Sequence, residues 1–241
     1  MIAFEPVARI HVLGLVSISS HGLAFLIGAL SCRWLCLRRL SDLEGRVLDN
    51  SIPLMVLGSC LGARSFYLLS RPDSWSTPEN WVRFWDGGMV SYGGLLGALV
   101  ALVYSTRRYD ICLASFFDRI APCLLIGWSI GRLGCFLTWY GEEGVRSELP
   151  WAVVVEGTGY HPVTLYISVG LLLSGLLLLR SPSDHPFRTS ALALLCYSLV
   201  RGLSDTWRVY ETNDLKLLSQ AMAGVLCLTA VSMLLYFRKS S

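Results

Sequence analysis

The sequence predicts an all-α fold, a polytopic membrane bundle of about seven transmembrane helices. Of its 241 residues, 54% are hydrophobic and only 15% are charged, whereas soluble domains carry about 25% charged residues. The mean hydropathy is +0.54. The apolar residues also fall in long runs, which a surface facing water cannot absorb. The composition therefore argues against a soluble enzyme and makes the bilayer the expected solvent.

Four runs contain no Asp, Glu, Lys or Arg, namely residues 12–32, 87–106, 157–179 and 217–237. Each is close to the roughly 20 residues that a helix needs to cross the hydrocarbon core. Three further apolar runs carry arginines, namely 51–70 with Arg64, 111–137 with Arg119 and Arg132, and 189–207 with Arg201. The first run is too long for a signal peptide and lacks a basic leader, so we expect a helix there.

These spans predict a single integral membrane domain over residues 1–241, with a short outer-face segment around 138–160. Basic residues set the orientation of such a domain, because cytoplasmic segments are enriched in Lys and Arg. If the spans alternate, ten basic residues flank one side: Arg33, Arg38, Arg39, Arg46, Arg107, Arg108, Arg180, Arg188, Arg238 and Lys239. Six flank the other: Arg9, Arg71, Arg83, Arg146, Arg208 and Lys216. We therefore expect the N-terminus outside and the C-terminus in the cytoplasm.

The arginines inside the spans point to a functional site. An arginine at the bilayer centre costs about 2.5–3.5 kcal/mol, so one that is retained usually faces a polar interior. At a rise of about 1.5 Å per residue, Arg64 and Arg201 lie roughly 20 Å and 18 Å from the cytoplasmic entry of their helices. Arg132 reaches the outer end of its own span. These positions predict a site in the outer half of the bilayer.

A polar stripe follows the sixth expected helix, formed by Tyr197, Arg201, Asp205 and Arg208. Spacings of four, four and three residues place these side chains on one helix face. One alternative is an Arg201–Asp205 ion pair that only neutralises itself.

Two further side chains could handle protons: Tyr92 near the outer start of its span, and His21 near the middle of the first span. For His21 the alternative is a hydrogen-bonded packing residue.

Glycines suggest two kinds of backbone. Gly58 with Gly62, and Gly127 with Gly131, have the four-residue spacing typical of closely packed helices. Doubled glycines at 87–88 and 93–94 weaken a helix, and there we expect broken or re-entrant backbone that lines a cavity.

Arginines that face a membrane cavity suit a phosphate group, because guanidinium offers a planar fork of donors and keeps its charge. A phospholipid head group is the anion available at that depth, and nearby Tyr and His side chains could move a proton. The eight cysteines include no CxxC pair, so we expect no metal site. We also expect no nucleic-acid partner. A lipid-modifying enzyme or a lipid-binding membrane protein is expected.

Four sequence blocks carry a family resemblance: FWDGGMVSYGGL at 84–95, IAP at 120–122, GRLGCF at 131–136 and HPVTLY at 161–166. In order and spacing they resemble the prolipoprotein diacylglyceryl transferase family of the bacterial plasma membrane. The resemblance extends from SHGL at 20–23 to the region of Arg201 and Asp205.

The resemblance implies a seven-helix, multi-pass enzyme of the bacterial inner membrane with its active site toward the outer half. Such an enzyme moves the diacylglyceryl group of phosphatidylglycerol onto the lipobox cysteine of a lipoprotein precursor and releases glycerol phosphate, without a cofactor. By position, Arg132 and Arg201 match the family's two essential arginines, Tyr197 matches its tyrosine, and Asp205 replaces a glutamate. The implied catalytic residues are His21, Tyr92, Arg132, Arg201, Tyr197 and Asp205. The implied substrate-binding residues are Arg64, Asp86, Gly93, Gly94, Gly134, Cys135, His161 and Arg208.

The chain departs from the family pattern at several positions. Tyr92 stands where the family has histidine, and His21 where it has tyrosine, which suggests an exchange in which His21 takes the proton-handling role. Cys135 replaces an asparagine and Ile167 replaces a glutamate.

A nearby acidic residue of the family aligns with Tyr140 unless a two-residue shift brings in Glu142. A paralogue with the same lipid donor but another acceptor, or a non-catalytic lipid-binding protein, would show the same pattern.

Overall fold

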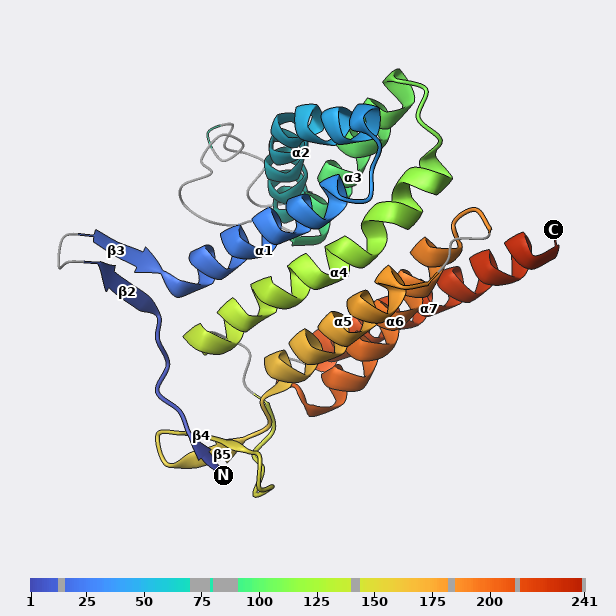
Figure 1. Ribbon diagram of the computed structural model, residues 1–241. Helices are drawn as coiled ribbons and strands as arrows, with labels where there is room; N and C mark the ends of the chain where they lie inside the picture. Colours follow the sequence, from blue (N-terminus) through green and yellow to red (C-terminus); the bar gives the residue numbers. More distant parts are fainter. Residues whose placement is uncertain are drawn as a thin grey trace. The chain divides into compact units, whose positions relative to one another are not determined.

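The computed structural model describes residues 1–12, 16–69, 79, 91–139, 144–181, 185–210 and 213–239. This part of the chain forms seven α-helices and five short β-strands (Figure 1). It divides into two compact units, one of Met1–Arg39 with Phe117–Ser241 and one of Leu40–Phe116. The predicted helical membrane bundle fits this architecture.

The first unit holds most of the helices: α1 (Ser20–Leu37), α4 (Leu113–Thr138, whose first residues belong to the second unit), α5 (Val163–Leu179), α6 (Arg188–Ser204) and α7 (Asn213–Lys239). The second unit contains α2 (Asp42–Leu69) and α3 (Ser91–Arg108). Within the described residues, four segments are long and apolar enough to cross a membrane: Ser20–Leu37, Asp42–Leu69, Leu113–Thr138 and Lys216–Tyr236. Helix α5 is apolar but shorter, with 17 residues. These four segments support the predicted spans that overlap them.

Helices α1 and α4 lie side by side and antiparallel (Figure 1), in contact through small residues. A Cβ atom at Gly127 would lie 2.8 Å from the carbonyl oxygen of Gly28 and 2.7 Å from the Cβ of Cys32. At Gly131 it would lie 3.3 Å from the Phe25 ring. The close packing predicted from the spacing of Gly127 and Gly131 is confirmed.

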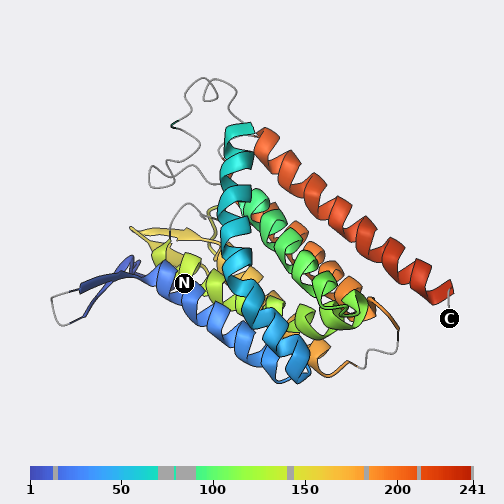
Figure 2. The same ribbon diagram turned by 90° about the horizontal axis from the view of Figure 1, so that it is seen from above.

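Glycines also bring α2 and α3 together in the second unit (Figure 2). A Cβ atom at Gly58 would lie 2.6 Å from the carbonyl oxygen of Gly97, and one at Gly62 would overlap the backbone of Gly93. Residues 93–94 therefore lie inside a regular helix, and the expectation of broken backbone there is wrong. A facing glycine explains the difference, because two helices without Cβ atoms can approach closely. Residues 87–88 lie outside the described part of the chain.

An apolar cluster joins α4, α5 and α6, which pack in succession. Its buried members are Leu125, Val163, Ile167, Leu171, Leu178 and Ala193. The Ser168 hydroxyl on α5 donates to the carbonyl oxygen of Ser129 on α4 at 2.8 Å. Burying the polar group with a partner avoids the cost of an unmade hydrogen bond.

At one end of this unit, polar side chains make hydrogen bonds between neighbouring helices. Arg39 donates to the carbonyl oxygens of Arg119 and Leu179, each at 3.1 Å. Asp118 Oδ1 accepts from both the backbone N–H and the hydroxyl of Ser190, each at 2.7 Å. The N-cap residue of α6, Phe187, has φ +59° and makes no side-chain cap. The carboxylate of Asp118 therefore replaces the missing cap from a neighbouring helix.

The strands lie outside the helices and were not predicted. A three-stranded sheet has the order β1 (Ile2–Ala3), β4 (Val153–Val155), β5 (Thr158–Tyr160), with β1 parallel to β4. Strands β2 (Arg9–Val12) and β3 (Val16–Ser19) form an antiparallel pair.

Several predicted span boundaries need correction. Helix α1 begins at Ser20 rather than at residue 12, with Ser19 Oγ as its N-cap acceptor. Helix α5 begins at Val163 rather than at residue 157, immediately after Pro162. Both boundaries were predicted too early because strands precede these helices, and a strand can be as free of charge as a helix.

Helix α2 instead starts earlier than the predicted residue 51, at Asp42. Ser41 Oγ accepts from the backbone N–H of Glu44 at 3.4 Å, and Glu44 Oε2 accepts from the backbone N–H of Ser41 at 2.8 Å. This reciprocal pair is a capping box. A search for uncharged runs misses it because its residues are polar.

Candidate functional site

Helix ends and connecting segments meet at one end of the first unit. Gly134 near the end of α4 packs against the backbone of His21 at the start of α1. The backbone N–H of Val145 donates to the carbonyl oxygen of Trp207, which follows α6, at 2.8 Å. The backbone N–H of His161, just before α5, donates to the carbonyl oxygen of Val145 at 3.0 Å. Most of the predicted site residues of this unit therefore lie at the same end.

Arg201 and Asp205 form the centre of the polar site. Arg201 Nε lies 3.2 Å from Asp205 Oδ1, with the Arg201 side chain 15% exposed and the Asp205 side chain fully buried. Ser219 near the start of α7 donates its hydroxyl to Asp205 Oδ2 at 2.6 Å. The predicted ion pair is thus present, and a third residue completes it. Sequence reasoning missed Ser219 because a turn and 14 residues separate it from Asp205.

The guanidinium of Arg201 keeps donors beyond those that meet Asp205 and Ser219. Its Nη2 donates to Ser219 Oγ at 3.4 Å. Its Nη1 is buried and makes no hydrogen bond within the described residues. Because Nε and Nη2 share one edge of the guanidinium plane, Nη1 remains for another acceptor.

Tyr210 lies beside this pair and was also missed. Its hydroxyl is buried, and burial is the main cause that raises the pKa of the Tyr210 phenol above its ordinary value. The charge of Asp205 raises this pKa further, whereas Ser219 and Arg201 oppose the shift. The phenol consequently stays protonated at neutral pH.

The predicted polar stripe does not continue as one helix face. Helix α6 ends at Ser204, and Asp205–Trp207 form the short 3-10 helix η4. Arg208 is extended, with φ −89° and ψ 139°, so the i, i+11 relation expected of it is wrong. Its guanidinium carbon lies 5.4 Å from the centre of the Tyr210 ring. Tyr197 packs against the apolar cluster of α4, α5 and α6.

Arg132 lies on α4, seven residues after Leu125 of the same cluster. Its Nη1 donates to the sulfur of buried Cys135 at 3.9 Å, and its guanidinium carbon lies 5.7 Å from the centre of the Trp128 ring. A thiol is a weak acceptor, so the hydrogen bond between Arg132 and Cys135 is weak.

The prediction that His21 lies near the middle of the first span is wrong, because His21 is the second residue of α1. Residues that were counted in the span form strand β3. The exposed His21 ring lies 4.7 Å from the Phe25 ring. A Cβ atom at Gly134 would lie 3.2 Å from the Cα of His21, which brings this histidine to the segment that carries Arg132.

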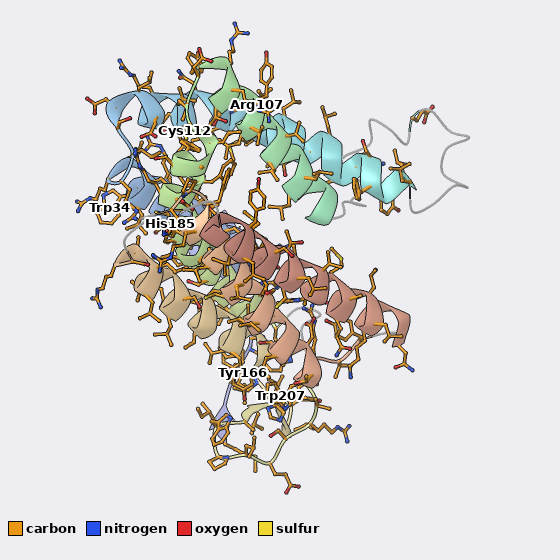
Figure 3. All side chains as sticks on the ribbon, turned by 90° about the vertical axis from the view of Figure 1, so that its right-hand side faces the viewer. Trp34, Arg107, Cys112, Tyr166, His185 and Trp207 are labelled. Atoms are coloured by element: carbon orange, nitrogen blue, oxygen red, sulfur yellow. The ribbon has the colours of Figure 1, made fainter. Side chains whose placement is uncertain are left out.

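His161 belongs to an aromatic group between β5 and α6. Its Nδ1 lies 3.2 Å from the Tyr166 hydroxyl, which also accepts from Trp151 Nε1 at 3.0 Å. The His161 ring stacks on Trp207, with ring centres 5.8 Å apart. Figure 3 shows Tyr166 and Trp207 next to each other at this end of the helices. These contacts hold the His161 ring between Tyr166 and Trp207, in the segment just before α5.

The remaining predicted residues lie elsewhere. Arg64, Gly93 and Gly94 belong to the second unit. Arg64 is 5% exposed, and its guanidinium carbon lies 5.3 Å from the centre of the Tyr67 ring. Asp86 and the side chain of Tyr92 lie outside the part of the chain that the structure describes. Among the described side chains, no group of three His, Cys, Asp or Glu residues could hold a metal ion.

Fold and site together define a helical membrane protein with arginines held at the ends of its helices. The family model of prolipoprotein diacylglyceryl transferase matches residues 7–238. The chain belongs to this family.

Similar proteins come from several bacteria. The phosphatidylglycerol–prolipoprotein diacylglyceryl transferase of Glaesserella parasuis serovar 5 (strain SH0165) is 31% identical over 226 residues, covering 87% of this chain and 82% of that protein. The protein of the same name from Methylobacillus flagellatus is 35% identical over 225 residues, covering 85% and 84%. The one from Bordetella avium (strain 197N) is 32% identical over 237 residues, covering 91% and 87%.

Proposed function

We propose that this chain transfers the diacylglyceryl group of phosphatidylglycerol to the lipobox cysteine of a prolipoprotein. Family membership over residues 7–238 supports a transferase of lipoprotein biosynthesis in the bacterial inner membrane. The observation that carries the proposal in the structure is Arg201, whose Nη1 is buried and makes no hydrogen bond within the described residues. A phosphate oxygen is the acceptor that suits such a donor.

The reaction exchanges one bond at the glyceryl carbon that carries the phosphate. The cysteine thiolate attacks this carbon, and a carbon–sulfur bond forms. The carbon–oxygen bond to the phosphate breaks, and its electron pair stays on the phosphate oxygen, which leaves as glycerol phosphate. Arg201 and Arg132 would stabilise the charge that develops on the leaving group.

The attacking thiol must first lose its proton, because a free cysteine has a pKa of about 8.5. We assign this step to His21, which takes the proton from the thiol and passes it to water. The packing of His21 against Gly134 supports the assignment, since Gly134 lies two residues from Arg132. Tyr92 remains a catalytic candidate from the sequence, as do Tyr197 and Asp205.

We also propose the topology that the sequence suggests: seven spans in one membrane domain, the N-terminus outside and the active site in the outer half. The clustering of His21, Arg132, His161 and Arg201 at one end of the first unit supports a site at a single depth. The proposed substrate-binding residues remain Arg64, Asp86, Gly93, Gly94, Gly134, Cys135, His161 and Arg208.

The direct test incubates the purified full-length protein with phosphatidylglycerol and a lipobox peptide. Mass spectrometry should detect a diacylglyceryl group on the peptide cysteine, and a peptide with serine in place of cysteine should stay unmodified. Arg201→Lys and Arg132→Lys should each lower the rate by about 10–100-fold, because lysine cannot present the planar fork of donors. Arg180→Lys, at an exposed arginine next to α5, is the matched control and should keep the wild-type rate. A wild-type rate in both site variants would refute the role of the arginines.

His21 is tested in the same assay. His21→Ala should slow transfer near neutral pH, and raising the pH toward the thiol pKa should recover part of the rate, because hydroxide then removes the proton. Full activity of His21→Ala at neutral pH together with loss in Tyr92→Phe would reject the proposed exchange of roles.

A related transferase with a different acceptor is the second candidate. Ile167, which replaces a glutamate of the family pattern, is 1% exposed within the apolar cluster, so no carboxylate is available at this position. Release of glycerol phosphate without modification of the peptide would favour this candidate. Absence of release would favour a lipid-binding protein.

A further inference from the structure

Ser219 links α7 to the buried carboxylate of Asp205. Ser219 is buried, with 8% of its surface exposed, and its hydroxyl donates to Asp205 Oδ2 at 2.6 Å. This distance is typical of a hydrogen bond between a hydroxyl and a charged carboxylate. The sequence offers no reason to single out this serine from the others in apolar helices.

The two oxygens of Asp205 face different helices. Oδ1 lies at ion-pair distance from Arg201 Nε, 3.2 Å away, and makes no hydrogen bond within the described residues. Oδ2 accepts the hydrogen bond of the Ser219 hydroxyl. Because the terminal torsion of aspartate is broad, this hydrogen bond is what holds the carboxylate plane and keeps Oδ1 facing the guanidinium of Arg201.

The orientation of Arg201 decides which donors face a ligand. Nε lies 3.2 Å from Asp205 Oδ1, and Nη2 donates to Ser219 Oγ at 3.4 Å. Both atoms lie on the same edge of the planar guanidinium. Nη1, on the other side, is buried and makes no hydrogen bond within the described residues. Ser219 thus acts on the two groups that set the direction of Nη1.

We propose that Ser219 is a positioning residue of the transferase, which fixes Asp205 so that Arg201 presents Nη1 to the phosphate of phosphatidylglycerol. The identity of this lipid rests on the proposed function. The Ser219 hydroxyl contacts Asp205 and Arg201, and in this proposal it acts on the reaction through the orientation of Arg201.

Three variants of the full-length protein test the proposal. Ser219→Ala removes the hydroxyl, and Ser219→Thr keeps it. Ser198→Ala is the matched control, because Ser198 is a buried serine of α6 whose hydroxyl donates within its own helix, to the carbonyl oxygen of Leu195 at 2.8 Å. For each, kcat and KM are measured with phosphatidylglycerol and the lipobox peptide. Binding to nanodiscs of phosphatidylglycerol is compared with binding to nanodiscs of phosphatidylcholine.

Ser219→Ala should lower kcat/KM by about tenfold, the loss typical of one hydrogen bond to a charged group. It should also weaken the preference for phosphatidylglycerol over phosphatidylcholine. Ser219→Thr should recover most of both, and Ser198→Ala should match the wild type. A thermal unfolding curve of each variant shows whether it is folded. Rescue by threonine separates positioning from a loss of fold.

The result also distinguishes this proposal from the proposed function. If the wild type modifies the peptide while Ser219→Ala keeps wild-type kcat/KM and lipid preference, Ser219 has no positioning role and the transferase function stands. If the wild type does not modify the peptide, the transferase function fails, and the positioning role of Ser219 is then judged from lipid binding alone. Reduced preference for phosphatidylglycerol in Ser219→Ala, restored in Ser219→Thr, then supports positioning, and equal preference in all variants overturns it.

Discussion

A methyl group added at Gly134 separates two roles for that residue. The family resemblance implies that Gly134 binds substrate, whereas the structure places it in the contact between α4 and α1. In Gly134→Ala the new Cβ would lie 2.6 Å from the Cβ of Ala24 and 3.2 Å from both the Cα and the carbonyl oxygen of His21. We expect this variant to push the start of α1 away from α4 and to displace His21.

The magnitude follows from these distances. Carbon atoms in contact prefer about 3.5–4.0 Å, so the pair at 2.6 Å overlaps by roughly 1 Å. Overpacking of this kind costs about 1–3 kcal/mol, and the better helix propensity of alanine returns about 1 kcal/mol. The free energy of unfolding should fall by about 1 kcal/mol, and the transfer rate should fall because His21 moves.

The assay is a double-mutant cycle with Ala24→Gly, which removes the closest contact. Unfolding in detergent and peptide modification are measured for the wild type, both single variants and the double variant. If packing is the role of Gly134, the double variant should recover both stability and rate, with a coupling energy of about 0.5–2 kcal/mol. Recovery of stability without recovery of rate would show a substrate contact. Unchanged stability in Gly134→Ala would refute the packing argument.

Two further predictions concern the fold. Asp118→Ala should lower the free energy of unfolding by about 2–3 kcal/mol, because it removes the acceptor for two donors of Ser190; Asp118→Asn, which keeps an acceptor, should lose less than half as much in the same detergent unfolding assay, and equal losses would contradict the capping role. Gly62→Val should lower the unfolding temperature strongly, since its Cβ would overlap the backbone of Gly93, whereas Gly224→Val on α7, where a Cβ would meet nothing within 4 Å, should leave it unchanged. A similar effect of both valines would show that helix propensity, and not packing, is responsible.

Charge-free runs located the helices of this protein well but not their ends. The absence of charge reports on contact with lipid and says little about backbone conformation. Val16 and Ile18 alternate with serines, which is a strand pattern, and they form β3 before α1 begins. Ser41 and Glu44 show the opposite error, because their capping box extends α2 beyond the apolar run.

The candidate site was predicted where its partners are close in sequence. Arg201 and Asp205 are four residues apart, and their pairing follows from helix periodicity. Ser219 and Tyr210 could not be found in this way, because their approach depends on the turn between α6 and α7. The prediction of broken backbone at Gly93 failed for a related reason, because Gly93 packs against a glycine of another helix, Gly62, which is distant in sequence.

The parallel pairing of β1 with β4 sets an order on synthesis. Ile2 and Ala3 pair with Val153 and Val154, so the first strand finds its partner only after four helices have left the ribosome. At about 5–20 residues per second, the delay is on the order of 10 s. During that time the first residues must remain on the side of the membrane where β4 will emerge. The segment between α4 and α5 thus completes a sheet that the first residues of the chain began.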